Sequence, residues 1–349
     1  MQNNILKLLP KMYFPGVIFH GEKCFSYFKN FFSDKNILVV ISDSFKKYNE
    51  TLCEDLFGEK VFYFIQEEEP SSENFERLKK EFLARNFNLI VAVGGGSVID
   101  LAKLVKKEFS LQMIAIPTTI GSGAEVSQHC ILFEDGIKRS FSDYNFIPET
   151  VILNPIFLAS LSDEQIVYQS IDSLAHALES LVSRLSNPLS DYFALSAIEN
   201  IYSGLNDLSE KGAQNNILEK IQIASVFSGL AQGNVATGLV HSFAHYFGAK
   251  NKISHARAVA IFLIDVLKFN LQHTSKYQKI DHLKRLSCDN FIHKIENLFQ
   301  KLNVEIKIEV QGNLQEIAEE IRKDICTTTN PYLPSNEDIV IILNKLKNG

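Results

Sequence analysis

Short apolar runs without polar alternation constrain the fold of this chain most strongly. Four of them lie in its first third, at residues 37–41, 61–65, 89–93 and 113–116. A continuous apolar run is typical of a strand buried on both faces. Amphipathic stretches with the spacing of helices lie between the runs, at 45–57, 74–86 and 98–109. This alternation predicts an α/β domain with a parallel sheet and right-handed helical crossovers.

The rest of the chain changes character near residue 158. A hairpin is expected at 130–143 around Asp135-Gly136, and a last strand at 151–155. Long helical patterns then replace strands, at 162–185, 187–205, 216–248 and 256–270. A final helix should follow Pro334, capped by Ser335 or Asn336. We therefore expect an α/β domain over 1–158, packed tightly against an all-helical domain over 159–349 with a cleft between them.

Composition excludes several classes of protein. The 35 Lys and Arg nearly balance the 41 Asp and Glu, whereas a general nucleic-acid binder needs a basic excess. No run approaches the roughly 20 apolar residues of a membrane span, and the N-terminus lacks the apolar core of a signal peptide. The five cysteines are scattered, without a C-x-x-C pair, which argues against disulfides and fits a reducing cytoplasm. We expect a cytoplasmic protein with neither nucleic-acid nor membrane partners.

A glycine-rich turn follows the third apolar run. Gly94, Gly95, Gly96 and Ser97 lie between this strand and the helix that begins near Val98. Glycines let the backbone approach an anion, and a helix N-terminus offers free N–H groups to a phosphate. A second turn of small residues, 117–125, follows the next strand, so both should lie at the carboxyl edge of the sheet. The same pattern also suits a tight junction between strand and helix that binds nothing.

Neither turn is the G-x-G-x-x-G fingerprint or a P-loop, so an ordinary dinucleotide or nucleoside-triphosphate motif is not supported. An acidic residue at a strand end, Asp43, precedes the glycines by about 50 residues, whereas the usual acidic residue follows them by roughly 20. If an adenosine ribose lies there, Asp43 would bind its hydroxyls and repel a 2′-phosphate, which favours NAD over NADP. A lone aspartate after a strand equally often starts a turn or caps a helix.

Histidines and an aspartate cluster in two apolar segments of the helical region. Asp172 and His176 are four residues apart, as are His241 and His245, and His255 follows. Residues four apart share a helix face. Each histidine alone is better explained as a partly buried side chain, but unpaired polar groups are costly in apolar segments. Together they could hold a divalent ion, and carboxylate–imidazole sets suit both Zn²⁺ and Fe²⁺. Four other histidines lie in polar or loop-like stretches and are expected at the surface: His129, His273, His282 and His293.

Six segments together resemble the iron-containing, or group III, alcohol dehydrogenase family. They occur in family order over nearly the whole chain: GGGSVIDLAK (94–103), IPTTIGSGAEVS (116–127), DSLAHALES (172–180), GLVHSFAHYFG (238–248), SHARAV (254–259) and TTTNPYLP (327–334). The resemblance implies a Rossmann-like nucleotide-binding domain followed by a helical metal-binding domain, with the active site between them. Val98 in place of a common proline, and Asn154-Pro155 in place of Asp-Pro, depart from the family pattern without removing a metal ligand.

The resemblance also implies roles for individual residues. The metal ligands would be Asp172, His176, His241 and His255, and His245 would lie near the nicotinamide as a proton relay. Asp100 would make a polar contact at the nicotinamide end of the cofactor. The other implied cofactor contacts are Asp43, Gly94, Gly95, Gly96, Ser97, Thr118, Thr119, Ser122 and, in a hairpin where the alignment is loose, Lys138.

The implied function is a metal-dependent, NAD(P)-linked alcohol dehydrogenase with Fe²⁺ or Zn²⁺ and preferably NAD. Its substrate would be a simple alcohol, diol or aldehyde, or alternatively a polyhydroxylated sugar or deoxy-sugar acid, for which Gln128-His129 gives a faint hint. A dehydroquinate synthase-like cyclase or glycerol-1-phosphate dehydrogenase would need more basic residues near the motifs. A metal- or nucleotide-sensing relative without turnover is a further alternative. We expect a homodimer.

Overall fold

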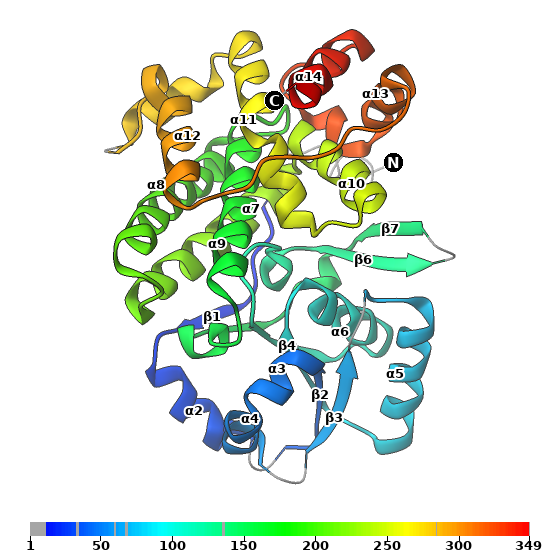
Figure 1. Ribbon diagram of the computed structural model, residues 1–349. Coiled ribbons are helices and arrows are strands. Elements are labelled where there is room, and N and C mark those ends of the chain that lie inside the picture. The colour runs from blue at the N-terminus through cyan, green and yellow to red at the C-terminus, as the bar shows by residue number, and fades with distance from the viewer. Residues whose placement is uncertain are drawn as a thin grey trace.

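A six-stranded parallel sheet forms the centre of the first half of the molecule (Figure 1). The computed structural model describes residues 12–32, 35–58, 61–66, 69–134, 137–283 and 285–348. The strands are β1 (Val17–His20), β2 (Ile37–Ser42), β3 (Phe62–Gln66), β4 (Leu89–Gly94), β5 (Gln112–Pro117) and β8 (Thr150–Leu153). They lie in the order β1-β8-β5-β4-β2-β3, and every adjacent pair is parallel. The α/β fold and the four predicted strands are therefore confirmed.

Helices cover both faces of this sheet because successive side chains of a strand point to opposite faces. On one face, Val39 and Ile41 pack against α2 (Lys23–Phe32), α3 (Asp43–Tyr48) and α4 (Glu50–Phe57). On the other, Leu38 and Val40 pack against α5 (Ser72–Arg85) and α6 (Gly96–Phe109). This arrangement explains why the strand sequences are apolar throughout.

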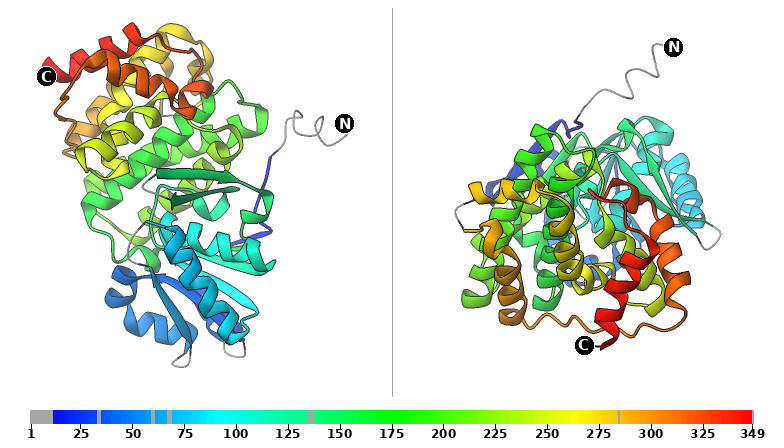
Figure 2. Two further views of the ribbon diagram at one scale, coloured as in Figure 1. Left: turned by 90° about the vertical axis from the view of Figure 1, so that its right-hand side faces the viewer. Right: turned by 90° about the horizontal axis from the view of Figure 1, so that it is seen from above.

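The second half of the chain is helical. Its helices are α7 (Asp163–Val182), α8 (Pro188–Lys211), α9 (Asn215–Val235), α10 (Leu239–Asn251), α11 (His255–His273), α12 (Phe291–Lys301), α13 (Leu314–Lys323) and α14 (Asn336–Asn348). Figures 1 and 2 show these helices stacked above the sheet. The strands β6 (His129–Glu134) and β7 (Ile137–Ser142) form the predicted antiparallel hairpin between the two halves, although its Asp135-Gly136 turn lies outside the described residues.

Helix ends follow local chemistry. The hydroxyl of Ser335 accepts a hydrogen bond from the Asp338 amide at 3.1 Å, so Ser335 caps α14 as expected. The single helix predicted over 45–57 is wrong, because the chain leaves helical geometry at Asn49 (φ −130°, ψ 40°) and is split into α3 and α4. There the Asn49 side chain donates to the Phe45 carbonyl and ends α3.

Two elements near the N-terminus, β1 and α2, have no counterpart among the sequence predictions. The strand β1 has four residues, and its apolar pattern is too short to indicate a strand by itself. It is defined by pairing with β8, 133 residues further along the chain, as shown by the Val17–Thr150 register. A short edge strand of this kind depends on its partner rather than on local propensity.

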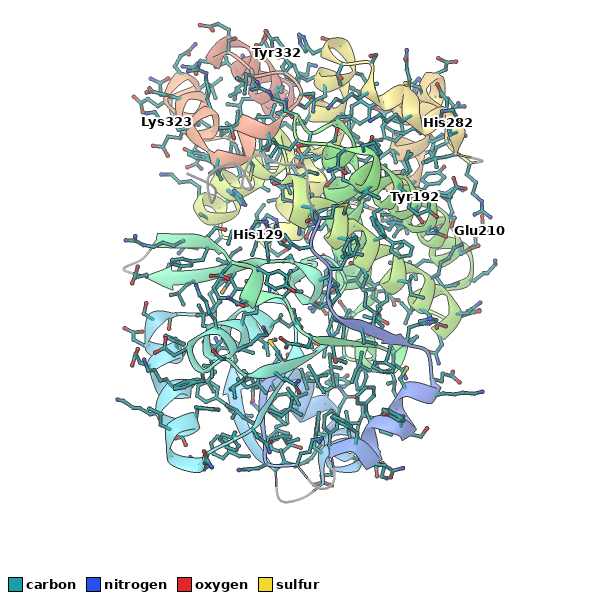
Figure 3. The ribbon with its side chains drawn as sticks, turned by 180° about the vertical axis from the view of Figure 1, so that it is seen from behind. His129, Tyr192, Glu210, His282, Lys323 and Tyr332 are labelled. Atoms are coloured by element: carbon teal, nitrogen blue, oxygen red, sulfur yellow. The ribbon has the colours of Figure 1, made fainter. Side chains whose placement is uncertain are left out.

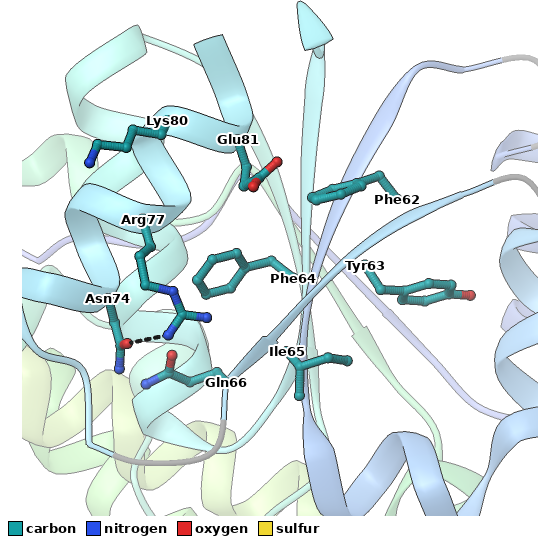
Figure 4. A pocket seen from close by; sticks show the side chains of 9 residues that line it. All are labelled: Phe62, Tyr63, Phe64, Ile65, Gln66, Asn74, Arg77, Lys80 and Glu81. Atoms are coloured by element: carbon teal, nitrogen blue, oxygen red, sulfur yellow. Dashed lines mark hydrogen bonds between the residues drawn. The ribbon is translucent and has the colours of Figure 1, made fainter. Parts of the chain in front are cut away.

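A hollow of about 540 Å³ lies beside the opposite edge of the sheet, between β3 and α5 (Figure 4). Phe64 projects from β3 toward the Arg77 guanidinium, 5.2 Å from the ring centre, and Asn74 accepts a hydrogen bond from the same side chain. The hollow contains none of the residues that the sequence predicts for a cofactor or a metal.

In the described part of the chain, no single helix combines the length and hydropathy needed to cross a bilayer. The helices α9 and α10 meet that criterion only when they are taken together, and they are bent by 99° with respect to each other.

Two glycines let the sheet half approach the helical half closely. A Cβ placed on Gly229 in α9 would lie 2.8 Å from the Cα of Gly123 and 2.8 Å from a methyl group of Val126. Real Cβ atoms essentially never approach other heavy atoms so closely. The short helix η1 (Ala124–Val126) therefore packs directly on the backbone of α9.

We expect Gly229→Ala to lower the free energy of unfolding by about 1–3 kcal/mol, because the added methyl group overpacks this contact. Gly248→Ala is the matched control, because a Cβ at that position of α10 would meet neighbours only at 3.7 Å or beyond. Alanine there should be neutral or slightly stabilising. The measurement is urea unfolding of both variants, and equal stabilities would contradict the packing described here.

Candidate metal and cofactor site

The two small-residue turns lie side by side at the carboxyl edge of the sheet. Gly94 pairs with Pro117 at the ends of β4 and β5, and the Thr118 amide donates to the Gly94 carbonyl at 3.1 Å. A Cβ on Gly95 would lie 3.1 Å from the Thr119 side chain. In the same way, a Cβ on Gly96 would lie 3.1 Å from Ser122. The predicted adjacency of the turns is confirmed, and it requires small residues at both glycine positions.

The first turn ends in the N-terminus of α6, a helix of 14 residues. Gly95 occupies the N-cap position, and no side chain of the described residues caps this helix. The amides of Gly96 and Ser97 belong to the first turn of α6, where N–H groups lack intrahelical partners. These groups and the positive end of the helix dipole suit a pyrophosphate.

Asp100 lies one turn further along α6 and is buried. Its carboxylate accepts hydrogen bonds from the Ile131 amide at 3.0 Å and from the Lys103 ammonium at 3.3 Å. Lys103 in turn donates to the carbonyl of His129 at 2.6 Å. Burial raises the pKa of Asp100, although Lys103 opposes this effect. The pair attaches α6 to the hairpin, while contact of Asp100 with the nicotinamide stays a prediction.

The two remaining cofactor candidates lie at the edges of this region. Asp43 is the first residue of α3, directly after β2, and its carboxylate pairs with Lys47 at 2.6 Å. It keeps 29% of its side-chain surface exposed, so it is accessible to a ligand. Lys138 belongs to β7, where its backbone pairs with Phe133, but its side chain lies outside the described residues.

A buried cluster in the helical half brings three of the predicted metal ligands together. Asp172 and His176 lie on one face of α7, and His241 lies on α10. Each offers a ligand atom, and these atoms all lie within 4.8 Å of one another. The Oδ1 atom of Asp172 and the Nε2 atom of His241 are buried without a hydrogen-bond partner. Buried polar atoms without partners are costly, so these residues fit a divalent ion that would bind both atoms.

His255 completes the predicted set from a third helix. It is the first residue of α11, whose N-cap is the hydroxyl of Ser254. Its Nε2 atom lies 3.7 Å from Oδ1 of Asp172, and its ring centre lies 5.4 Å from that of His241. The side chain of His255 keeps 42% of its surface exposed, so the cluster is open to solvent on this side.

Each buried histidine is oriented by a partner on its other ring nitrogen. The Nδ1 atom of His176 donates to the Gly121 carbonyl at 3.1 Å. The Nδ1 atom of His241 donates to the Glu179 carboxylate at 2.6 Å. Both rings therefore present Nε2 to the cluster, as metal-binding histidines with such outer contacts do. Gly121 belongs to the second small-residue turn, so the cofactor region and the ion cluster are in direct contact.

Glu179 is a candidate site residue that is absent from the sequence predictions. It is 2% exposed and accepts hydrogen bonds from the amides of Gly238 (2.8 Å) and Val240 (2.6 Å) as well as from His241. It thus caps the N-terminus of α10 and orients the His241 ring at the same time. Glu179 is seven residues after Asp172, so both lie on the same face of α7. This spacing in the sequence could have indicated that Glu179 belongs to the site.

The electrostatics of the cluster match these contacts. Burial lowers the pKa of His176 to about 4, so this ring is neutral at neutral pH, as a ligand must be. Burial also disfavours a charge on His241, but the Glu179 and Asp172 carboxylates outweigh it and raise that pKa to about 9. Without an ion, His241 therefore carries a proton between two carboxylates. A divalent ion would displace this proton and supply the positive charge instead.

His245 lies one turn beyond His241 and faces a different partner. Its Nδ1 atom donates to Oδ2 of Asp324 at 2.9 Å. Its ring stacks against that of His255, with the ring centres 5.6 Å apart. The side chain of His245 is 44% exposed, so it connects the cluster region with solvent.

The surface position predicted for His129 is wrong. His129 is half-buried at the start of β6, between the hairpin and the helical half (Figure 3). Its Nε2 atom bonds the Gly233 carbonyl in α9 at 2.9 Å, and the buried Gln128 amide donates to the same carbonyl. Burial lowers the pKa of His129. This long-range contact leaves no local signal in the sequence. His273, His282 and His293 are exposed, as expected.

We expect Glu179→Gln to weaken divalent-metal affinity roughly 10–100-fold, which is the usual effect of removing the partner of a ligating histidine. The carboxylate of Glu179 accepts hydrogen bonds from N–H groups only. The amide nitrogen of glutamine is itself a donor, so it could not accept one of these hydrogen bonds. The measurement is metal retention against a competing chelator, with the exposed Glu210→Gln as the control. Unchanged retention in Glu179→Gln would contradict the orienting role.

Comparisons with known proteins agree with this geometry. Residues 15–155 match the family model described as iron-containing alcohol dehydrogenase, and residues 166–347 match its C-terminal counterpart. The chain is 28% identical to a 4-hydroxybutyrate dehydrogenase of Clostridium kluyveri, over 98% of this chain and 99% of that protein. It is 27% identical to an NADPH-dependent butanol dehydrogenase of Clostridium saccharobutylicum, over 91% and 92% of the two chains.

Two solved structures share the fold. One is an iron-containing alcohol dehydrogenase from Thermococcus thioreducens, with a TM-score of 0.86 and 24% identity over 97% of this chain and 100% of that chain. The other is a sulfoacetaldehyde reductase from Bifidobacterium kashiwanohense in complex with NAD⁺, with a TM-score of 0.88 and 18% identity over 97% and 99%. With the two family models covering most of its length, the chain belongs to the iron-containing alcohol dehydrogenase family, whose members are metal-dependent, NAD(P)-linked oxidoreductases acting on alcohols.

Proposed function

We propose that this chain interconverts a small alcohol and its aldehyde or ketone with NAD, using Asp172, His176, His241 and His255 to hold the ion. The observation that carries the proposal is the contact between the second cofactor turn and the ion cluster. The Gly121 carbonyl accepts a hydrogen bond from His176, and a Cβ on Gly121 would lie 3.3 Å from the Asp172 carboxylate. A cofactor bound along this turn therefore ends next to the ion.

Different residues have different roles in the proposed reaction. When bound, a divalent ion supplies a Lewis acid for the substrate oxygen, and the nicotinamide supplies the hydride acceptor. The glycines and the N-terminus of α6 hold the pyrophosphate, together with Ser97, Thr118, Thr119 and Ser122. His245 takes up the proton that the alcohol releases and passes it to solvent, while Asp324 fixes its ring through Nδ1. Imidazole suits this task because one ring nitrogen can accept a proton while the other is held by a partner.

Several features favour a simple alcohol or diol over a polyhydroxylated substrate. The polar pair Gln128-His129 was the hint for a hydroxyl-rich pocket, but both side chains bond the Gly233 carbonyl. The relatives named above act on butanol and 4-hydroxybutyrate according to their names. Family membership also favours a dehydrogenase over the cyclase and sensor alternatives. The polyhydroxylated substrate remains the second candidate, and a panel of alcohols tested with Fe²⁺ and Zn²⁺ separates the two.

We extend the proposal to assembly, location and domain division. The edge strand β1 leaves Val17 48% exposed, next to the exposed Phe14, which supports a homodimer. The near balance of 35 basic and 41 acidic residues argues against a nucleic-acid partner. All five cysteines are free, which supports a reducing cytoplasm. The change from strands to helices between Leu153 and Asp163 supports a domain boundary at residue 158.

Removal of one ligand tests the ion site. We expect His255→Ala to lose both bound metal and turnover, because His255 supplies one of four ligands. Metal content by mass spectrometry and NADH absorbance with a panel of alcohols are the two measurements. His293→Ala, at a position 82% exposed, is the control and should retain both. Full activity of His255→Ala after chelation would overturn the ligand assignment.

The coenzyme preference is tested at Asp43. We expect Asp43→Asn to raise the ratio of kcat/KM for NADP to that for NAD roughly tenfold or more, because like-charge repulsion of a 2′-phosphate is removed. Asp55→Asn, in a surface pair with Lys29, is the charge-matched control. One relative is NADPH-dependent according to its name, so coenzyme preference differs among similar proteins and this test can distinguish the two coenzymes. A ratio that does not change would mean that the adenosine ribose lies elsewhere.

A further inference from the structure

A second group of metal-binding side chains lies beside the ion cluster and shares no residue with it. It consists of His245 on α10 and of Asp324 and Cys326 at the helix η6 (Ile325–Thr329). One ligand atom from each lies within 4.8 Å of the others. Imidazole, carboxylate and thiol together form a donor set that binds Zn²⁺ better than it binds harder ions such as Mg²⁺.

The three side chains of this group lie near enough to one another for a small adjustment to form a zinc site. Tetrahedral zinc with ordinary bond lengths holds its nitrogen, oxygen and sulfur ligands about 3.3–3.6 Å apart. The Nδ1 atom of His245 and Oδ2 of Asp324 are 2.9 Å apart, joined by a hydrogen bond. An ion between them would take the place of this hydrogen bond. The ligand atom of Cys326 lies within 4.8 Å of the other two and would need to approach by up to about 1.2 Å.

The carboxylate is held in position by the other oxygen. Oδ1 of Asp324 accepts hydrogen bonds from the Cys326 amide at 2.8 Å and from the Ser242 hydroxyl at 3.1 Å. Ser242 is buried and is itself bonded by Thr327 at 2.8 Å. Oδ2 therefore faces His245 in a fixed direction, so little ordering is left for the ion to impose.

Cys326 carries its proton in the free protein. Burial raises the pKa of its thiol, and the neighbouring negative charge of Asp324 raises it further. Such a thiol is a poor nucleophile. A divalent ion reverses the situation, because a coordinating thiol is deprotonated by the charge of the ion.

We propose that His245, Asp324 and Cys326 form a second, inhibitory zinc site. Zinc bound there releases the thiol proton, and the proton of Nδ1 moves to Nε2 as Nδ1 becomes a ligand. The ring that we assign to proton transfer can then no longer accept a proton. The inhibition rests on the proposed function, whereas the metal site itself does not. The consequence is a dehydrogenase that needs one divalent ion and is inhibited by excess Zn²⁺.

Cobalt(II) serves as a spectroscopic probe of the site, because thiolate-to-cobalt charge transfer absorbs in the near ultraviolet. The Asp172 cluster contains no sulfur, so its loading gives no such band. In a titration of the full chain, the band should appear with the second equivalent of Co²⁺ and disappear when Zn²⁺ is added. The band should be absent in Cys326→Ser and retained in Cys288→Ser, whose half-exposed thiol lies elsewhere.

Inhibition is measured separately with the metal-loaded enzyme. Wild type and Cys288→Ser should lose NADH formation as the second equivalent of Zn²⁺ binds, and Cys326→Ser should need at least tenfold more free Zn²⁺. Thermal unfolding checks that each variant is folded. No band in wild type, or a band retained in Cys326→Ser, would overturn the site; a band without inhibition would overturn the inhibitory role. A chain that oxidises no alcohol would refute the proposed function and leave the cobalt result to decide the site.

Discussion

The buried chain of charges from Asp172 through His241 to Glu179 is the interaction on which the rest of the helical half depends. Two carboxylates in an apolar core are unstable unless positive charge and hydrogen-bond donors surround them. His241 lies between the two, 3.5 Å from Asp172 and 2.6 Å from Glu179. The amides of α10 supply the remaining donors. This series of charges therefore explains how α10 begins after the sharp bend and how the His241 ring is oriented.

Main chain of the second turn takes part in the contact between the two halves of the molecule, beside side-chain contacts such as that of His129 with Gly233. Gly121 and Gly123 belong to the second turn, and each brings main chain against a helix of the other half. Gly121 meets the ion cluster on α7, whereas Gly123 meets Gly229 on α9. The contact of Gly123 with Gly229 joins two main chains and leaves little room for adjustment, because no side-chain rotamer can absorb a shift there. The cofactor turn and the ion cluster are thus held in a fixed relation, which transfer of hydride requires.

The abundance of phenylalanine, 26 residues without a tryptophan, has a structural explanation in part. Phe28, Phe32 and Phe57 fill the space between the sheet and the helices α2 and α4, and the rings of Phe32 and Phe57 lie 5.0 Å apart. On the opposite face Phe82 stacks on Phe109 at 4.3 Å. Aromatic clusters of this kind cover a parallel sheet with large apolar surfaces and leave no polar atom to satisfy.

The amino-acid sequence by itself determined the parallel sheet, the two turns and the candidate ligands. Apolar runs, glycines before a helix and residues four apart are local patterns, and local patterns survive in a single sequence. The tertiary structure alone decided the rest. It paired β1 with β8, joined His245 to Asp324 and placed Gln128 and His129 on Gly233, all across long separations in the chain. Such contacts depend on how distant elements pack, which no short segment of the sequence specifies.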